Sequence, residues 1–173
     1  MPELQSEAGK LVILVATMTG AAEMLAEDLQ AELGGPEKVE LRLLENAVAA
    51  DFPTTGLALV VSSTYGTGDV PETAERALAS LLAEKPELRA LRFGVISLGD
   101  SHYGDTFAKG GLHWDDALRQ CGARRVGEIL KIDCQTGDDP AEVARPWLAD
   151  WLAIAVGADA DMASGKARTD IAR

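Results

Sequence analysis

The sequence predicts an α/β fold, a doubly wound parallel sheet of five strands with helices on both faces. Three observations predict it. Apolar strands alternate with amphipathic helices in the order βαβαβαβαβα, which is typical of parallel sheets with helical crossovers. Several strands are near-continuous apolar runs, as expected of strands covered on both faces. The length of 173 residues suits a single domain with its own core.

The first half of the chain contains three predicted strands. The segment "KLVILVAT" (10–17) is an apolar run and predicts a buried strand. The helix after it has an apolar stripe and ends at Gly34. The more amphipathic "VELRLL" (39–44) predicts a strand nearer an edge of the sheet. The segment "GLALVVSST" (56–64) predicts a third, strongly buried strand.

The second half repeats the alternation. A helix over about 72–83 leads to the fourth strand, "LRFGVISLG" (91–99). A long loop and a helix over about 112–121 precede the fifth strand, "RRVGEILKID" (124–133). The last helix covers roughly 140–156.

Domain organisation follows from these elements. Residues 10–156 are expected to form one domain, because no repeat and no linker interrupts them. Residues 1–9 are expected to be a flexible N-terminus, and the aperiodic 157–173 a disordered tail. Pro146 lies inside the last predicted helix, which therefore begins there or is kinked.

The composition indicates a globular protein, with 47% hydrophobic and 25% charged residues. The formal net charge is −12. This charge disfavours nucleic acid and anionic membranes as partners, and it indicates either a basic protein partner or simply solubility. No apolar run reaches the roughly 18 residues that span a bilayer. The polar start "MPELQSEAGK" is unlike a signal peptide, so we expect a cytoplasmic protein.

The cysteines and histidines predict no metal site. Cys121 and Cys134 form neither a CxxC pair nor a ligand cluster, so two reduced thiols are expected. The two histidines, His102 and His113, are too few and do not have the spacing of metal ligands.

The loop "TMTGAAE" after the first strand predicts an anion site. In sheets of this kind ligands bind beyond the carboxyl ends of the strands, where the strand order reverses. Thr17 and Thr19 supply hydroxyls, and Gly20, Ala21 and Ala22 leave backbone N–H groups uncovered at a helix N-terminus. The loop matches neither GxxxxGK[ST] nor GxGxxG. A threonine-capped tight turn is the structural alternative.

Two further loops carry aromatic residues. In "STYGTGDVP", Gly66 and Gly68 permit positive φ beside Tyr65. The loop "LGDSHYGDTFAKGG" is long for a strand–helix connection and carries Tyr103. Ordinary turns with surface tyrosines are the alternative. Together the two tyrosines and the neutral anion loop suit a flat ring with a phosphate tail.

These three loops resemble those of the flavodoxin family. The segment "TMTGAAE" is similar to its T/S-x-T-G-x-A/T-E phosphate loop, "TYGTGDVPE" to its T-Y/H-G-x-G-D-x-P loop, and "LGDSHYGDTF" to its G-D/N-x-x-Y-x-x-F loop. The likeness covers about residues 10–156 and is greater to the short-chain form, the FMN domain of MioC-type proteins and diflavin reductases. It implies a flavodoxin-like sheet of order 2-1-3-4-5 and non-covalently bound FMN.

The resemblance also implies roles for individual residues. The first loop would bind the FMN phosphate, and Tyr65 and Tyr103 would stack on the two faces of the isoalloxazine ring. Asp133, at the end of the fifth strand, matches a flavin-contacting position of the diflavin branch. The candidate cofactor-binding residues are Thr17, Met18, Thr19, Gly20, Ala21, Ala22, Ser63, Thr64, Tyr65, Gly66, Thr67, Gly68, Leu98, Gly99, Asp100, His102, Tyr103, Phe107 and Asp133.

The chain departs from the family pattern in two places. Ala21 stands where Asn or Thr is common, which removes one polar contact to the phosphate. The segment "YGDTF" is one residue longer than the diflavin Y-x-x-F, which leaves the roles between Gly104 and Phe107 open.

The function implied by the resemblance is electron transfer. FMN would carry electrons from an NAD(P)H-dependent flavodoxin reductase to an acceptor enzyme, and the protein would act as a monomer. Asp69, Glu72, Asp100 and Asp105 would form an acidic flavin edge on which basic partners dock, or only a solvated acidic face.

Three alternatives remain. An FMN-dependent oxidoreductase would reduce a small substrate such as a quinone, but two covering tyrosines argue against it. A phosphorelay receiver would need acids where the chain has Thr17, Thr19 and Thr64. A degenerate fold would act only as a binding module.

Overall fold

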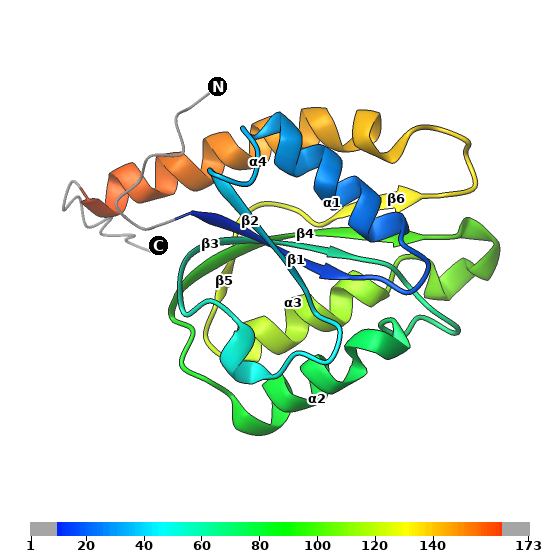
Figure 1. Cartoon of the computed structure of the whole chain (residues 1–173), viewed down its shortest axis with the longest axis horizontal. Coiled ribbons are helices and arrows are strands. Elements are labelled where there is room, and N and C mark those ends of the chain that lie inside the picture. Colours follow the sequence, from blue (N-terminus) through cyan, green and yellow to red (C-terminus); the bar gives the residue numbers. More distant parts are fainter. Residues whose placement is uncertain (1–9, 164–173) are drawn as a thin grey trace, which may run out of the picture.

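One parallel sheet lies between two layers of helices in the computed structural model, which describes residues 10–163 (Figure 1). The strand order is β2-β1-β3-β4-β5, with β6 also paired to β4, and every pairing is parallel. The strands are β1 (Leu11–Ala16), β2 (Val39–Leu43), β3 (Thr55–Ser62), β4 (Ala90–Gly99), β5 (Arg124–Arg125) and β6 (Leu130–Asp133). The order 2-1-3-4-5 implied by the sequence is thereby confirmed.

The predicted fifth strand is interrupted in the middle, so the prediction of one continuous strand over 124–133 was wrong. Its first piece, β5, pairs with β4 at Arg92 and Phe93, and its second piece, β6, pairs with β4 from Ile96 to Gly99. Gly127 lies between the pieces with φ of 70°. Glycine adopts this left-handed conformation without steric cost, and a residue in it cannot continue a strand.

The helices cover the sheet in pairs (Figure 1). Helices α1 (Ala21–Glu32) and α4 (Pro140–Ala163) pack on one face, and α2 (Glu75–Glu84) and α3 (Gly110–Gln120) lie on the other. Side chains of β1 point alternately to the two faces of the sheet and so contribute to a hydrophobic core on each face. Leu11, Ile13 and Val15 pack in the core under α1 and α4, and Val12, Leu14 and Ala16 pack in the core under α2 and α3. The apolar run of the first strand is therefore explained by burial on both faces.

Helix α4 is longer than the sequence predicts. It begins at Pro140, where the missing N–H costs nothing, so Pro146 lies inside the helix and does not start it. It continues to Ala163, seven residues beyond the end at 156 that the sequence predicts. The rest of the expected tail and residues 1–9 lie outside the described residues.

Short 3₁₀ turns connect several elements. They are η1 (Ala49–Asp51), η2 (Glu72–Ala74) and η3 (Ser101–Thr106). The helix predicted from residue 72 starts as η2, and the long loop after β4 contains η3. Within residues 10–163, no helix has both the length and the apolar character that a membrane crossing needs.

Candidate functional site

A cavity of about 440 Å³ lies at the carboxyl edge of the sheet, where the loops after β1, β3, β4 and β6 meet. This is the edge at which sheets of this topology bind ligands. The volume is in the range of pockets for small cofactors. The cavity is lined by Thr19, Ala21, Ser63, Thr64, Tyr65, Gly66, Leu98, Gly99, Asp100, Tyr103, Thr106, Phe107, Cys134 and Gln135.

The loop after β1 offers backbone donors to an anion. The backbone N–H of Gly20 donates to Thr17 Oγ1 at 3.0 Å, and Thr73 Oγ1 donates to Thr17 O at 2.7 Å. Gly20 is the N-cap of α1 with φ of 91°, and no side chain caps the helix. The first N–H groups of a helix have no acceptor within it, so those of Ala21 and Ala22 remain available. Thr17 thus closes a tight turn, but no threonine caps α1, and the uncovered N–H groups could bind an anion as ligand.

The loop after β3 is a closed turn that presents an aromatic ring. The backbones of Tyr65 and Asp69 exchange two hydrogen bonds of 2.9 Å each, and Gly66 and Gly68 inside the turn have φ of 53° and 101°. The positive φ expected for both glycines is confirmed. The Tyr65 side chain is 52% exposed and borders the cavity.

Helix α3 supports this turn from below. The backbone N–H of Gly110 donates to Thr64 Oγ1 at 2.9 Å, and His113 Nε2 donates to Gly68 O at 2.8 Å. A Cβ on Gly110 would lie 2.3 Å from Ser63 O, so only glycine permits this approach. The turn is therefore anchored to α3 at both of its ends.

The loop after β4 carries the second aromatic ring on η3. Tyr103 is 61% exposed and lines the cavity, and Thr106 Oγ1 donates to Tyr103 O at 3.1 Å. The end of the loop is fixed by Ser97, which is fully buried: its hydroxyl donates to Ala108 O at 2.7 Å and accepts from the N–H of Gly111 at 2.9 Å. The Tyr103 ring thus extends from a loop that is held at its base.

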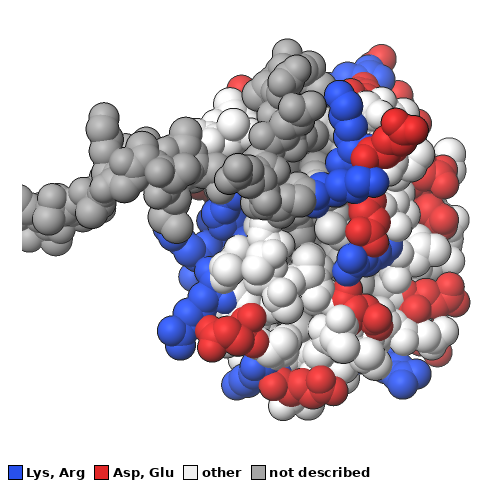
Figure 2. Space-filling model, turned by 60° about the vertical axis from the view of Figure 1, so that its left-hand side comes forward, with Lys and Arg blue, Asp and Glu red and all other residues white. Residues whose placement is uncertain are grey.

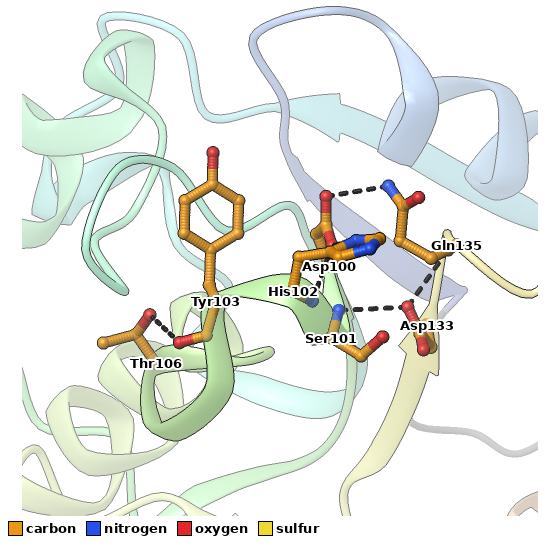
Figure 3. Close-up of polar contacts among 7 residues, drawn as sticks. All are labelled: Asp100, Ser101, His102, Tyr103, Thr106, Asp133 and Gln135. Atoms are coloured by element: carbon orange, nitrogen blue, oxygen red, sulfur yellow. Dashed lines mark hydrogen bonds and ion pairs between the residues drawn. The ribbon is translucent and has the colours of Figure 1, made fainter.

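Polar side chains join this loop to the segment after β6 (Figure 3). Asp133 Oδ1 accepts from the backbone N–H groups of Ser101 at 3.1 Å and Gln135 at 3.0 Å. Asp100 Oδ1 accepts from the N–H of His102 at 2.8 Å and lies 2.9 Å from its Nδ1. Gln135 Nε2 donates to Asp100 Oδ2 at 2.7 Å. Two carboxylates and one carboxamide therefore connect the two loops.

These contacts and nearby charges set the protonation of two groups. Hydrogen bonding from Ser101, and then from the N–H of Gln135, lowers the pKa of the Asp133 carboxyl. Surrounding protein atoms, and then the charge of Asp133, raise the pKa of the Cys134 thiol. At neutral pH the first group is therefore ionised and the second is a neutral thiol that borders the cavity.

Comparison with known proteins decides the family. The flavodoxin family model matches residues 13–147. Protein MioC from Escherichia coli K12 is 34% identical over 147 residues, which cover 82% of this chain and 95% of MioC. The chain belongs to the flavodoxin family. Flavodoxin YqcA from the same strain is 34% identical over 144 residues, which cover 80% of this chain and 93% of YqcA.

Solved flavodoxin structures agree with the fold. The C101S mutant of a flavodoxin from Pseudomonas aeruginosa aligns with a TM-score of 0.72 at 33% identity, covering 84% of this chain and 98% of that chain. The flavodoxin fold, the parallel sheet and the strand order implied by the three loop motifs are thus confirmed.

The structure brings together most of the residues that the flavodoxin motifs suggested. Those that line the cavity are Thr19, Ala21, Ser63, Thr64, Tyr65, Gly66, Leu98, Gly99, Asp100, Tyr103 and Phe107. Those outside the lining are Thr17, Met18, Gly20, Ala22, Thr67, Gly68, His102 and Asp133. Thr17 and Gly20 still shape the first loop, and Gly68 and Asp133 hold the loops beside the cavity.

Two cavity residues, Cys134 and Gln135, lie outside the loops that the motifs indicated, and a third, Thr106, lies inside the predicted loop 98–107 but was not among the candidate residues. Thr106 lies in the segment where the family motif and this chain differ in length. Cys134 and Gln135 follow the carboxyl end of the fifth strand, so the rule on strand ends would have indicated them. No motif did so, because that segment has no glycine run and no aromatic residue.

The lining residues fit FMN, the cofactor of flavodoxins. Neutral backbone donors at the start of α1 suit a phosphate. Two exposed tyrosines from different loops suit the faces of a flat ring. Asp100 carries the single formal charge among the side chains that line the described cavity, so the ring would meet a largely neutral wall.

Proposed function

We propose that the protein is an electron carrier that binds FMN non-covalently in the cavity at the carboxyl edge of the sheet. The observation that carries the proposal is the meeting of a neutral anion loop with Tyr65 and Tyr103 around one cavity. Family membership supports the same cofactor and the same function. The bound FMN would supply the redox chemistry, and the protein would supply binding and orientation.

The first loop would hold the phosphate without a cation. The N–H groups of Ala21 and Ala22 would donate to phosphate oxygens, and the helix dipole of α1 would add partial positive charge. The hydroxyls of Thr17 and Thr19 would complete the donor set. Ala21 has no side-chain donor, so backbone groups carry more of the binding here than in relatives with Asn or Thr at this position.

The two tyrosines would enclose the ring. Tyr65 is fixed by the turn that closes on Asp69, and Tyr103 is fixed by η3. Stacking on both faces would keep water from the ring and bind its flat surface. The carboxylate of Asp100 would oppose any gain of negative charge by the bound group, which lowers its reduction potential.

An FMN enzyme with its own small substrate is the competing function. A substrate such as a quinone needs one open face of the ring, and Tyr65 and Tyr103, which both line the cavity, would leave none if each stacked on one face. The carrier function is therefore favoured. Turnover of a small quinone with NAD(P)H as the sole added partner would favour the enzyme instead.

Redox proteins are the expected partners. We propose an NAD(P)H-dependent flavodoxin reductase as donor and an acceptor enzyme as the recipient, both docking on the acidic rim formed by Asp69, Glu72, Asp100 and Asp105. Three of these side chains, Asp69, Glu72 and Asp105, are exposed. We place this monomeric carrier in the cytoplasm, in keeping with its free cysteines, Cys121 and Cys134.

The visible spectrum of the purified protein tests the proposal. Flavin absorption bands that survive gel filtration, and that bleach when a flavodoxin reductase and NADPH are added, are the expected result. Chain purified without colour should regain the bands when FMN is added. A colourless protein that takes up no FMN would refute the proposed function.

A further inference from the structure

The carboxamide of Gln135 connects two loops at the edge of the cavity. It extends from the segment after β6 to the loop after β4, and both Gln135 and Asp100 line the cavity. Figure 3 shows its amide nitrogen directed at the Asp100 carboxylate while Tyr103 rises from the next turn of the same loop.

Asp100 is the group that starts the turn carrying Tyr103. It is the N-cap of η3, and its side chain accepts from the N–H of His102. Its backbone carbonyl accepts from the N–H of Tyr103 at 3.1 Å. A hydrogen bond from Gln135 to this carboxylate therefore acts on the residue that sets the direction of the tyrosine.

The charged and titratable groups around the Asp100 carboxylate favour an uncharged hydrogen-bond donor at position 135. His102 Nδ1 lies 2.9 Å from Asp100 Oδ1 within the same loop. The carboxylate of Asp133 and the thiol of Cys134 lie on the opposite segment, and the charge of Asp100 acts on that thiol. A carboxamide at position 135 donates to Asp100 without adding charge between two carboxylates.

Asp133 provides the second connection between the segments. Its Oδ1 accepts from the N–H of Ser101 and from the N–H of Gln135, so it fixes the backbone from which the Gln135 side chain starts. Asp133 is absent from the residues that line the described cavity. The residue that the family likeness placed against the flavin thus supports the loops, and Gln135 meets the cavity.

We propose that Gln135 is a positioning residue of the FMN site, which fixes the start of the Tyr103 loop through its hydrogen bond to Asp100. The proposal rests on the proposed function, because FMN binding is the property that it controls. In this proposal, FMN binding depends on Gln135 as the hydrogen-bond donor to the Asp100 carboxylate and not on the size of its side chain.

Three variants test the polarity of this bond: Gln135→Ala, Gln135→Glu, and the exchange Asp100→Asn with Gln135→Glu. The dissociation constant of FMN is measured by quenching of flavin fluorescence between about pH 5 and about pH 8, a range in which an isolated carboxylate remains ionised. Gln135→Ala should weaken binding about tenfold throughout this range.

Gln135→Glu should show an FMN affinity that, relative to the wild type at the same pH, depends on pH; the ratio removes the titration of His102 and of the FMN phosphate, which both proteins share. At about pH 8 two facing carboxylates repel, and FMN binding should weaken about 100-fold; toward about pH 5 the pair shares a proton and most of the affinity returns. The exchange variant places the donor on residue 100 and the acceptor on residue 135. Its affinity should return to within about threefold of the wild type at every pH.

Gln120 offers a matched control. Its Nε2 donates to Asp116 Oδ2 at 2.8 Å on the exposed side of α3, so Gln120→Glu makes the same charge change outside the cavity. It should leave FMN binding unchanged. Urea unfolding followed by tryptophan emission confirms that each variant is folded.

The outcomes separate this inference from the proposed function. If the wild type binds FMN but the affinity of Gln135→Glu relative to the wild type is the same at both ends of the pH range, or the exchange variant fails to recover, the positioning role is overturned alone. If the wild type itself binds no FMN, both the proposed function and this inference are overturned.

Discussion

At the scale of single residues, the cavity is lined mainly by uncharged groups, and carboxylates accept the hydrogen bonds that hold two of the surrounding loops. The loop after β1 presents backbone N–H groups and is closed by Thr17, and Tyr65 and Tyr103 border the cavity. The carboxylates of Asp100 and Asp133 accept hydrogen bonds that fix loop backbones. Charge in this site therefore serves first to hold the loops.

Asp133 predicts a particular response of stability to acid. Its folded pKa lies below its unfolded value of about 3.9, so its stabilising contribution is complete above that value and is lost as the pH falls through the folded pKa. The stability difference between wild type and Asp133→Asn should therefore be constant above about pH 5 and shrink below about pH 4.

Urea midpoints of the apoprotein measure this difference. Asp138→Asn, which removes an exposed carboxyl of the same segment, is the control and should show no such trend. A wild-type advantage that grows on acidification would contradict the assignment of Asp133 as a hydrogen-bond acceptor.

The limits of sequence reasoning at this scale are physical. Tyr65, Tyr103 and the first loop were found because glycines and aromatics after apolar strands are unusual. Gln135 was not found, because a polar residue in a surface segment carries no local signal. Its role depends on Asp100, 35 positions away, and only the pairing of β6 with β4 brings the two together.

At the scale of elements, the sheet edge is completed by an interrupted strand. Pairing of β5 and β6 with β4 on either side of Gly127 was invisible in the apolar pattern, because one glycine inside a strand-like run is ordinary. The extension of α4 was missed for a related reason: short alanine-rich segments have helix propensity but no apolar period. Strand order and helix placement followed from alternation and the family motifs.

The break after β5 is held by a partly buried ion pair. Arg125 lies 2.8 Å from Asp115 Oδ2, donates through Nε to Gly127 O, and is 28% exposed, whereas the Asp115 side chain is 9% exposed. Arg119, which is 61% exposed, lies 3.5 Å from the same oxygen. Removing the inner partner should leave a buried carboxylate poorly compensated.

Arg125→Met should therefore lower the free energy of unfolding by about 2 kcal/mol. Arg119→Met should lower it by less than about 0.5 kcal/mol, because that pair is largely solvated. Denaturant titrations of the two apoproteins make the comparison. Equal losses would show that Asp115 does not depend on the inner arginine.

At the scale of the whole molecule, several basic side chains lie near the starts of strands although the net charge is −12. Lys10, Lys38, Arg89 and Arg124 precede or open strands, so they lie at the amino edge of the sheet. Figure 2 brings that side forward and shows basic side chains spread among acidic ones. The carboxyl edge, with its acidic rim, would thus turn toward a basic partner.

Salt should weaken the encounter with a reductase. The second-order rate of reduction by a basic flavodoxin reductase should fall about tenfold between low and about 0.5 M ionic strength. Replacing Glu72 and Asp105 by Gln and Asn should flatten this dependence. Replacing Glu37 and Glu84 by Gln changes the net charge by the same amount away from the rim, so it should leave the salt dependence as it is in the wild type. A rate that does not depend on salt would contradict electrostatic steering.

Binding of FMN compared with riboflavin tests the central claim most directly, because riboflavin has the same ring and no phosphate. Titration of the apoprotein should show a single FMN per chain, bound about 100-fold more tightly than riboflavin, as two or more hydrogen bonds to a charged phosphate require. Equal affinity for the two, or uptake of neither, would contradict the account of a neutral loop that holds the phosphate and two tyrosines that hold the ring.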